Sequence, residues 1–199
     1  MVERHRDVFP LSVAWVTVRD VHEDEELTTS ADEPPPVPSE HLLAGRGNLE
    51  NMVAATLTEL LPYSRRLSVT VADPENSELA RAQAWVTSNK ITGAQVGEWA
   101  GTPVDGPDVV GWISHWPVSA QGPAGTAARF FQPGGDAAEL AVDLADWLHT
   151  VLADNGVSAP VPPCPGHPHP MRPVAHEATP WWQCPHGGLV RPWPALPAR

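Results

Sequence analysis

Two segments of the chain carry the pattern of a helix with one apolar face. Over residues 48–61 the apolar positions recur every three or four residues, and Pro62 ends the pattern because proline cannot continue the helical hydrogen bonds. The apolar positions are Leu49, Met52, Val53, Leu57, Leu60 and Leu61. We therefore expect an amphipathic helix that buries this stripe.

A second helix is predicted over residues 136–154. Its expected buried stripe is Leu140, Leu144, Trp147, Leu148, Val151 and Leu152. Asp136 and Glu139 have the spacing of a capping box, and Asn155-Gly156 is a typical end signal. A third helix is expected over 74–88, after an N-cap at Asp73.

Strand patterns lie between the helices. Residues 9–19 are rich in Val, Trp and Thr and apolar on both faces, and 67–71 alternate between apolar and polar. Residues 91–118 contain five glycines without a helical period, so we expect two strands there, with a short strand near 128–132 after them. The prediction for residues 1–158 is an α+β domain, a mixed sheet packed by two or three helices.

An acidic segment interrupts this domain. Residues 20–40 hold eight acids, no Lys or Arg, and the run Pro34-Pro35-Pro36, in a chain whose net charge is −12. Such a segment buries too little apolar surface to offset the cost of ordering, so it is predicted to be a solvated loop. Binding of a basic partner through residues 20–40 is the alternative.

Composition disfavours several classes of protein. No stretch approaches the ~20 apolar residues of a membrane span, and MVERHRDVFP does not resemble a secretory signal, so we expect a cytoplasmic protein without membrane contact. The acidic net charge disfavours general nucleic-acid binding. The basic residues are scattered, and only Arg65-Arg66 are adjacent.

The composition changes after residue 158. Residues 160–199 contain 12 of the 24 prolines, both cysteines and three of the nine tryptophans. Neither a helix nor a long regular strand fits this density of proline. Since free coil seldom carries three tryptophans, something besides ordinary core burial is expected to order residues 159–199.

Cysteine and histidine cluster in this tail. The sequence CPGHPHPMRPVAHEATPWWQCPHGG places two cysteines and four histidines within 23 positions. Structural zinc takes four such ligands, often as two short pairs across a loop, and metal binding can order a segment that has no core of its own. The predicted ligands are Cys164, His167, Cys184 and His186, with His169 as the substitute for one histidine. His176 is expected to be exposed.

Two alternatives to zinc remain at this stage. Cys164 and Cys184 could form a disulfide, which the expected cytoplasmic location disfavours, or they could be free thiols beside unrelated histidines. Trp181 and Trp182 precede the second cysteine. We expect one ring to cover the metal site and the other to face the main domain or a partner, with packing on the domain favoured.

The tail resembles the C-termini of uncharacterised proteins from actinobacteria and their phages that carry the pattern CPxHxHP…WWxCP. The matching residues are Cys164, Pro165, His167, His169, Pro170, Trp181, Trp182, Cys184 and Pro185. The resemblance covers roughly the last 30 residues. It implies a zinc-ribbon-like element and no defined activity.

No catalytic motif stands out. The chain has no H-E-x-x-H, G-x-S-x-G, Walker or Rossmann pattern. His115 is expected to be structural, because its neighbour Ser114 would point to the other face of a strand, and His149 is placed on the polar side of its helix. An active site assembled from distant residues such as Asp105, Asp108 and His115 stays open.

The favoured function is a non-enzymatic interaction or assembly component whose tail is fixed by zinc. A component of a phage or phage-like particle is one version of it, and the expected partner is a protein or a second copy of the chain. The first alternative is a small zinc hydrolase that uses His167, His169 and Cys184, with Glu177 as the base. The second is the acidic protein that binds a basic partner through residues 20–40.

Overall fold

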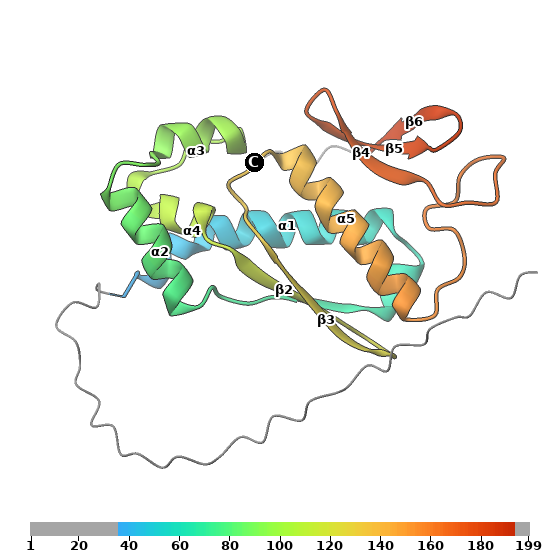
Figure 1. Ribbon diagram of the computed structural model, residues 1–199, viewed down its shortest axis with the longest axis horizontal. Helices are drawn as coiled ribbons and strands as arrows, with labels where there is room; N and C mark the ends of the chain where they lie inside the picture. The colour runs from blue at the N-terminus through green and yellow to red at the C-terminus, as the bar shows by residue number, and fades with distance from the viewer. Residues whose placement is uncertain (1–35, 194–199) are drawn as a thin grey trace, which may run out of the picture. The chain divides into compact units, whose positions relative to one another are not determined.

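The computed structural model describes residues 36–193, which fold into five α-helices and two three-stranded sheets (Figure 1). The α-helices are α1 Leu43–Glu59, α2 Asn76–Thr87, α3 Gly93–Ala100, α4 Val109–Ile113 and α5 Ala137–Asp154. The strands are β1 Ser68–Val71, β2 Trp116–Gly122, β3 Gly125–Phe131, β4 Arg172–His176, β5 Thr179–Cys184 and β6 Gly188–Pro192. Short 3₁₀ helices are η1 Ser39–Leu42, η2 Tyr63–Arg66 and η3 Gly106–Asp108. The α+β class is confirmed.

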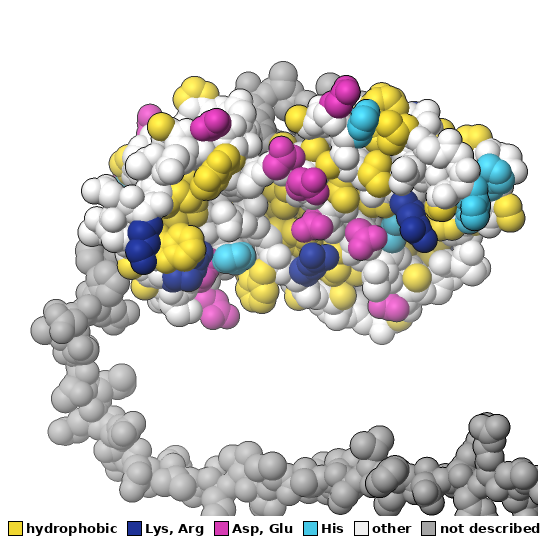
Figure 2. Space-filling model, turned by 45° about the horizontal axis from the view of Figure 1, so that its top comes forward, with side chains coloured by type: hydrophobic (Ala, Val, Ile, Leu, Met, Phe, Trp, Pro, Cys, Tyr) yellow, Lys and Arg dark blue, Asp and Glu magenta, His cyan; other side chains and the backbone are white. Residues whose placement is uncertain are grey.

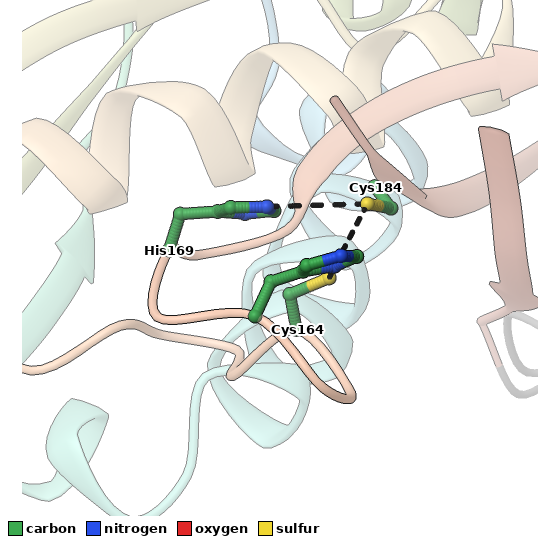
Figure 3. Close-up of side chains that lie close together, drawn as sticks. Cys164, His169 and Cys184 are labelled. Carbon is green, nitrogen blue, oxygen red and sulfur yellow. Dashed lines mark hydrogen bonds between the residues drawn. The ribbon is translucent and has the colours of Figure 1, made fainter. Parts of the chain in front are cut away.

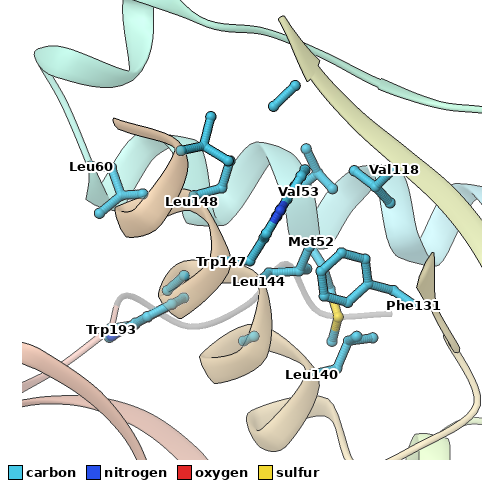
Figure 4. Packing of buried hydrophobic residues seen from close by; sticks show 14 of the residues in the cluster. Met52, Val53, Leu60, Val118, Phe131, Leu140, Leu144, Trp147, Leu148 and Trp193 are labelled. Atoms are coloured by element: carbon cyan, nitrogen blue, oxygen red, sulfur yellow. The ribbon is translucent and has the colours of Figure 1, made fainter. Parts of the chain in front are cut away.

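The first sheet has the order β1-β2-β3, and both of its strand pairs are antiparallel. Alternate residues of β2, Trp116, Val118 and Ala120, are fully buried, as expected for a strand with one face on the core. Helices α1 and α5 supply the other side of this core, where Met52 and Leu144 lie near Val118 and Phe131 (Figure 4).

Both sheets pack against helix α5. The whole stripe predicted from the sequence is buried. The Asp136 carboxylate accepts hydrogen bonds from the backbone N–H groups of Ala138 and Glu139, at 2.8 and 3.0 Å, and so caps the helix. The helix and its N-cap at Asp136 are confirmed.

Helix α1 starts five residues before the predicted Asn48. The added turn contains Gly45, which lies against the backbone of α4, where a Cβ would meet the carbonyl oxygen of Gly111 at 2.6 Å. This close approach of two backbones extends the helix beyond its apolar stripe. The predicted end is confirmed, since α1 stops at Glu59, before Pro62.

The second sheet has the antiparallel order β4-β5-β6 and lies against α5 (Figure 1). Its Trp182, together with Cys164, Met171 and Trp193, belongs to the same buried cluster as the α5 stripe. The proline-rich tail therefore forms three short strands rather than the long regular strand that its prolines disfavour.

Residues 91–118 differ from the prediction of two strands. They form α3, η3 and α4, and β2 begins only at Trp116. Thr92 and Gln95 form a complete capping box at the start of α3, and Gly101 ends it in the left-handed conformation, φ 66°. These local end signals outweighed the glycine content on which the strand prediction rested.

Several predictions fall on or beside residues that the structure does not describe. The strand expected at 9–19 and residues 20–35 of the acidic segment lie outside the described residues. Of that segment, Ser39 and Glu40 are the first two residues of the 3₁₀ helix η1. None of the helices in residues 36–193 is long and apolar enough to cross a membrane.

Candidate metal centre

Two segments of the tail bring four metal-ligating side chains together. Cys164, His167 and His169 come from the loop before β4, and Cys184 ends β5. One ligand atom from each of the four lies within 4.8 Å of the others, so the group can hold a metal ion. Figure 3 shows the labelled side chains of Cys164, His169 and Cys184 converging on one point from these two segments.

Both cysteines sit in turns of the same kind. The backbone N–H of His167 donates to the carbonyl of Cys164, and that of Gly187 donates to the carbonyl of Cys184, each at 3.2 Å. Gly187 N–H also points at Cys184 Sγ, at 3.2 Å. Such a turn directs a backbone N–H toward a thiolate, which stabilises the ionised, metal-binding form.

The loop that carries three of the ligands is closed by its own backbone. Cys164 N–H donates to the carbonyl of His169 at 3.2 Å, and Met171 N–H donates to that of Pro162 at 2.9 Å. Residues two apart in an extended segment share a face, and here His167 and His169 stack with ring centroids 5.1 Å apart. Both histidines of the H-P-H sequence therefore face the same point.

The separations suit a tetrahedral ion. Cys164 Sγ and Cys184 Sγ lie 3.5 and 3.4 Å from His167 Nδ1, and Cys184 Sγ lies 3.9 Å from His169 Nε2. With Zn–S near 2.3 Å and Zn–N near 2.0 Å, sulfur and nitrogen ligands of tetrahedral zinc are about 3.6 Å apart. These three sulfur–nitrogen separations are compatible with a four-coordinate metal ion.

The centre is buried on its cysteine side and open on its histidine side. Cys164 and Cys184 are 5% and 4% exposed, whereas His167 is exposed and His169 half-buried. Figure 2 shows histidine side chains gathered at one end of the face that it draws. A metal ion bound here would lie at the surface, with its sulfur ligands protected.

The two thiols differ in acidity. Burial, followed by the neighbouring thiol of Cys184, raises the pKa of Cys164. Burial opposes ionisation of Cys184 too, but the backbone N–H groups of His186 and Gly187 and the Cys164 thiol lower its pKa below the ordinary value. Cys184 is thus the thiol that the fold prepares for ionisation.

The structure places His186, one of the four predicted ligands, next to the group rather than in it. Its ring centroid is 5.3 Å from that of His169 and 6.3 Å from that of His167, and its side chain is exposed. His169, predicted only as a substitute, is in the group instead. His176 is exposed, as expected, and packs edge-on against Trp181 at 5.9 Å.

Trp182 fixes the second sheet on the domain. It is fully buried, stacks between His149 of α5 and Trp193, at 5.6 and 5.0 Å, and donates its indole N–H to Glu59 Oε2 at 2.6 Å. Packing of this tryptophan on the domain agrees with the favoured expectation. Trp181 packs edge-on against the ring of His176.

His149 occupies a different environment from the one predicted. The second sheet covers its side of α5, so the ring stacks on Trp182 and its Nε2 is buried without a hydrogen-bond partner among the described residues. Burial lowers the pKa of His149, although Asp146 partly opposes the shift. The helical pattern placed the residue correctly but could not reveal the sheet that covers it.

His115 has a structural role at the junction of α4 and β2. Its backbone N–H and its Nδ1 lie 2.7 and 2.8 Å from Glu78 Oε1, and Arg81 contacts the same carboxylate at 2.6 and 2.7 Å. Asp108, by contrast, pairs with His41 at 3.0 Å. Asp108 and His115 therefore have separate partners rather than a shared site.

Two carboxylates with structural roles were missed from the sequence. Glu59 is 6% exposed and bonds both Trp182 and Arg191, and Glu78 bonds Arg81 and His115. No sequence pattern marks Glu59, because its partners lie more than 120 positions away. The i, i+3 spacing of Glu78 and Arg81 could have revealed that pair.

Comparison with known proteins adds no relative, since no protein-family model, curated protein or solved structure matches this chain.

Proposed function

We propose that Cys164, His167, His169 and Cys184 bind one zinc ion as a structural centre, in a protein whose function is non-enzymatic interaction or assembly. The observation that carries the proposal is the convergence of two thiols and two imidazoles from separate segments within 4.8 Å. Two thiolates with two neutral imidazoles are a common ligand set for structural zinc. The ion would complete the zinc-ribbon-like element expected from the sequence.

A structural rather than a catalytic role follows from the ligand count. Four protein ligands fill the tetrahedral coordination of zinc and leave no position for a substrate water. The hydrolase alternative also needs Glu177 as its base. Glu177 precedes the first residue of β5, whereas Cys184 is the last residue of that strand. At about 3.4 Å per residue the two are separated by roughly 20 Å, too far to act on one water.

An interaction role is supported by what the tail does in the fold. It forms a small sheet that is anchored on α1 and α5 and turns the histidine side of the centre outward. Large apolar side chains are exposed elsewhere, among them Trp85, Trp99 and Phe130, at 44%, 47% and 59%. Exposed aromatic residues are enriched where proteins bind one another.

The test is the metal content of the purified chain, measured by elemental mass spectrometry. We expect one equivalent of zinc, lost in both Cys164→Ser and Cys184→Ser. His176→Ala is the matched control, because this tail histidine lies outside the group. A metal-free wild-type chain, or zinc retained in both cysteine variants, would refute the proposal.

A further inference from the structure

Strand β1 has one unpaired edge in the described part of the chain. It pairs with β2 on its other side only. Ala72 N–H donates to the carbonyl of Pro117 at 2.9 Å, and antiparallel hydrogen bonds alternate along a strand. The backbone groups of Val69 and Val71 therefore point away from β2, where the Val71 carbonyl accepts a bond from Arg46 Nη2 at 3.2 Å.

An apolar groove runs along this edge, between β1 and α1. It has a volume of about 380 Å³ and is lined by Glu50, Val53, Ala54, Leu57, Val69, Thr70 and Val71. Natural proteins usually protect an open edge with a charge or a proline on the strand. Ser68–Val71 carries neither, and the charge that reaches the edge is Arg46 of α1, at the Val71 carbonyl. The edge and the groove together suit the addition of another strand.

The two ends of β1 carry opposite charges. Arg65 and Arg66 precede the strand, are exposed and have no ion pair within residues 36–193. Asp73 and Glu75 follow it and are also exposed, although Asp73 lies 3.3 Å from Arg46. A strand that pairs antiparallel with a copy of itself would bring each basic end against the acidic end of the other copy.

We propose that the chain forms a two-fold symmetric dimer through the β1 edge. The two three-stranded sheets then join into one sheet of six, in which Val69 of each copy exchanges backbone hydrogen bonds with Val71 of the other, and the Val71 carbonyl accepts from the partner strand in place of Arg46. A two-fold axis perpendicular to the sheet keeps both α1 helices on the same side, where they cover the joined strands. The interface goes beyond the proposed zinc centre and does not depend on it.

Charge exchange in the full-length chain tests the dimer. One variant is Arg65→Glu/Arg66→Glu and the other is Asp73→Arg/Glu75→Arg, all at exposed positions. Light scattering after gel filtration and sedimentation equilibrium give the mass and the dissociation constant, and circular dichroism checks that each variant folds. We expect a wild-type dimer, and in either charge-reversal variant a dissociation constant raised by about ten-fold or more, since each reversal turns two attractive contacts repulsive.

Mixing the two variants supplies the decisive result. In their heterodimer an acidic end of one variant faces a basic end of the other at both ends of the strand pair. We therefore expect wild-type affinity to return in the mixture. A wild-type chain that stays monomeric at high micromolar concentration would overturn the proposal. If the Val69 and Val71 amides of that monomer are protected from hydrogen exchange, another segment of the same chain occupies the edge. A dimer insensitive to both reversals would overturn it too. Repeating the measurement on Cys184→Ser separates this outcome from that of the zinc proposal, because the dimer should persist without zinc.

Discussion

The indole N–H of Trp182 donates to the carboxylate of Glu59 across 123 positions of sequence, at 2.6 Å. Arg191 Nη2 approaches the same oxygen at 2.7 Å, while the Glu59 side chain is only 6% exposed. The last residue of α1 thus bonds two neighbouring strands of the second sheet, β5 and β6. This contact attaches the segment that carries Cys184 to the rest of the domain.

Glu59→Ala should destabilise the fold by about 1–3 kcal/mol, because it leaves the buried indole N–H of Trp182 without its acceptor, while the half-exposed Arg191 is hydrated instead. Glu59→Gln keeps an acceptor for the indole and should cost less. Urea unfolding of the three proteins measures the differences. Glu177→Ala, at a carboxylate that is 87% exposed, is the control and should be neutral. Equal stability of Glu59→Ala and Glu177→Ala would mean that this anchor does not hold the sheet.

His169→Ala should weaken zinc binding strongly, whereas His186→Ala should leave most of it. His169 Nε2 belongs to the group within 4.8 Å, and His186 is an exposed neighbour of it. Competition with a chromophoric chelator gives the zinc affinity of each variant, and we expect His169→Ala to lose about 10-fold or more. The opposite order of the two variants would make His186 the fourth ligand.

Glu78 should give the fold an acid-labile contribution to stability. Burial opposes its ionisation, but hydrogen bonds from Arg81 and from His115 lower its pKa to about 2 from 4.5. A lowered carboxyl pKa stabilises the folded state at pH values above 4.5, and this stabilisation is lost as the pH falls from 4.5 toward 2.

The measurement is the difference in unfolding free energy between wild type and Glu78→Gln as a function of pH. It should be largest near neutral pH and shrink below pH 4.5, while metal loss in acid affects both proteins alike. A difference that does not change with pH would show that the Glu78 carboxylate is not selectively stabilised.

His149 should titrate below its ordinary pKa of 6.5, because burial against Trp182 disfavours the charged ring. The folded state then prefers the neutral ring, so its stability declines as the pH falls below 6.5. Nuclear magnetic resonance titration of the His149 ring gives the pKa directly. His149→Phe should remove that part of the pH dependence, and a ring that titrates at or above 6.5 would contradict the stacked, buried placement.

The parts of the fold that were predicted correctly are those with strong local patterns. The α5 stripe repeats from Leu140 to Leu152 in a helix that begins at a capping aspartate, and the alternation around β1 is unbroken. The strand prediction for residues 91–118 was wrong because it gave more weight to the five glycines than to the capping box of Thr92 and Gln95, which is also present in the sequence. Short helices such as α4 have too few residues to show a period.

Three of the four residues in the metal-ligating group, Cys164, His167 and Cys184, were predicted as ligands from the spacing of the sequence. The two cysteines mark the two segments that supply the ligands. The turn after each cysteine is formed by residues within three positions of it, so a local sequence pattern can reveal it. The choice between His169 and His186 depends on the path of the loop closed by Pro162 and Met171, which no pattern specifies. The anchor at Glu59 and the burial of His149 arise from contacts between distant segments and were not predictable from the sequence.

X-ray absorption spectroscopy at the zinc edge of the purified protein measures the ligand set of the metal centre directly. We expect one four-coordinate zinc with two sulfur ligands near 2.3 Å and two imidazole nitrogens near 2.0 Å. Protein without zinc, or zinc with a different sulfur count or an oxygen ligand in its first shell, would contradict a closed centre formed by Cys164, His167, His169 and Cys184.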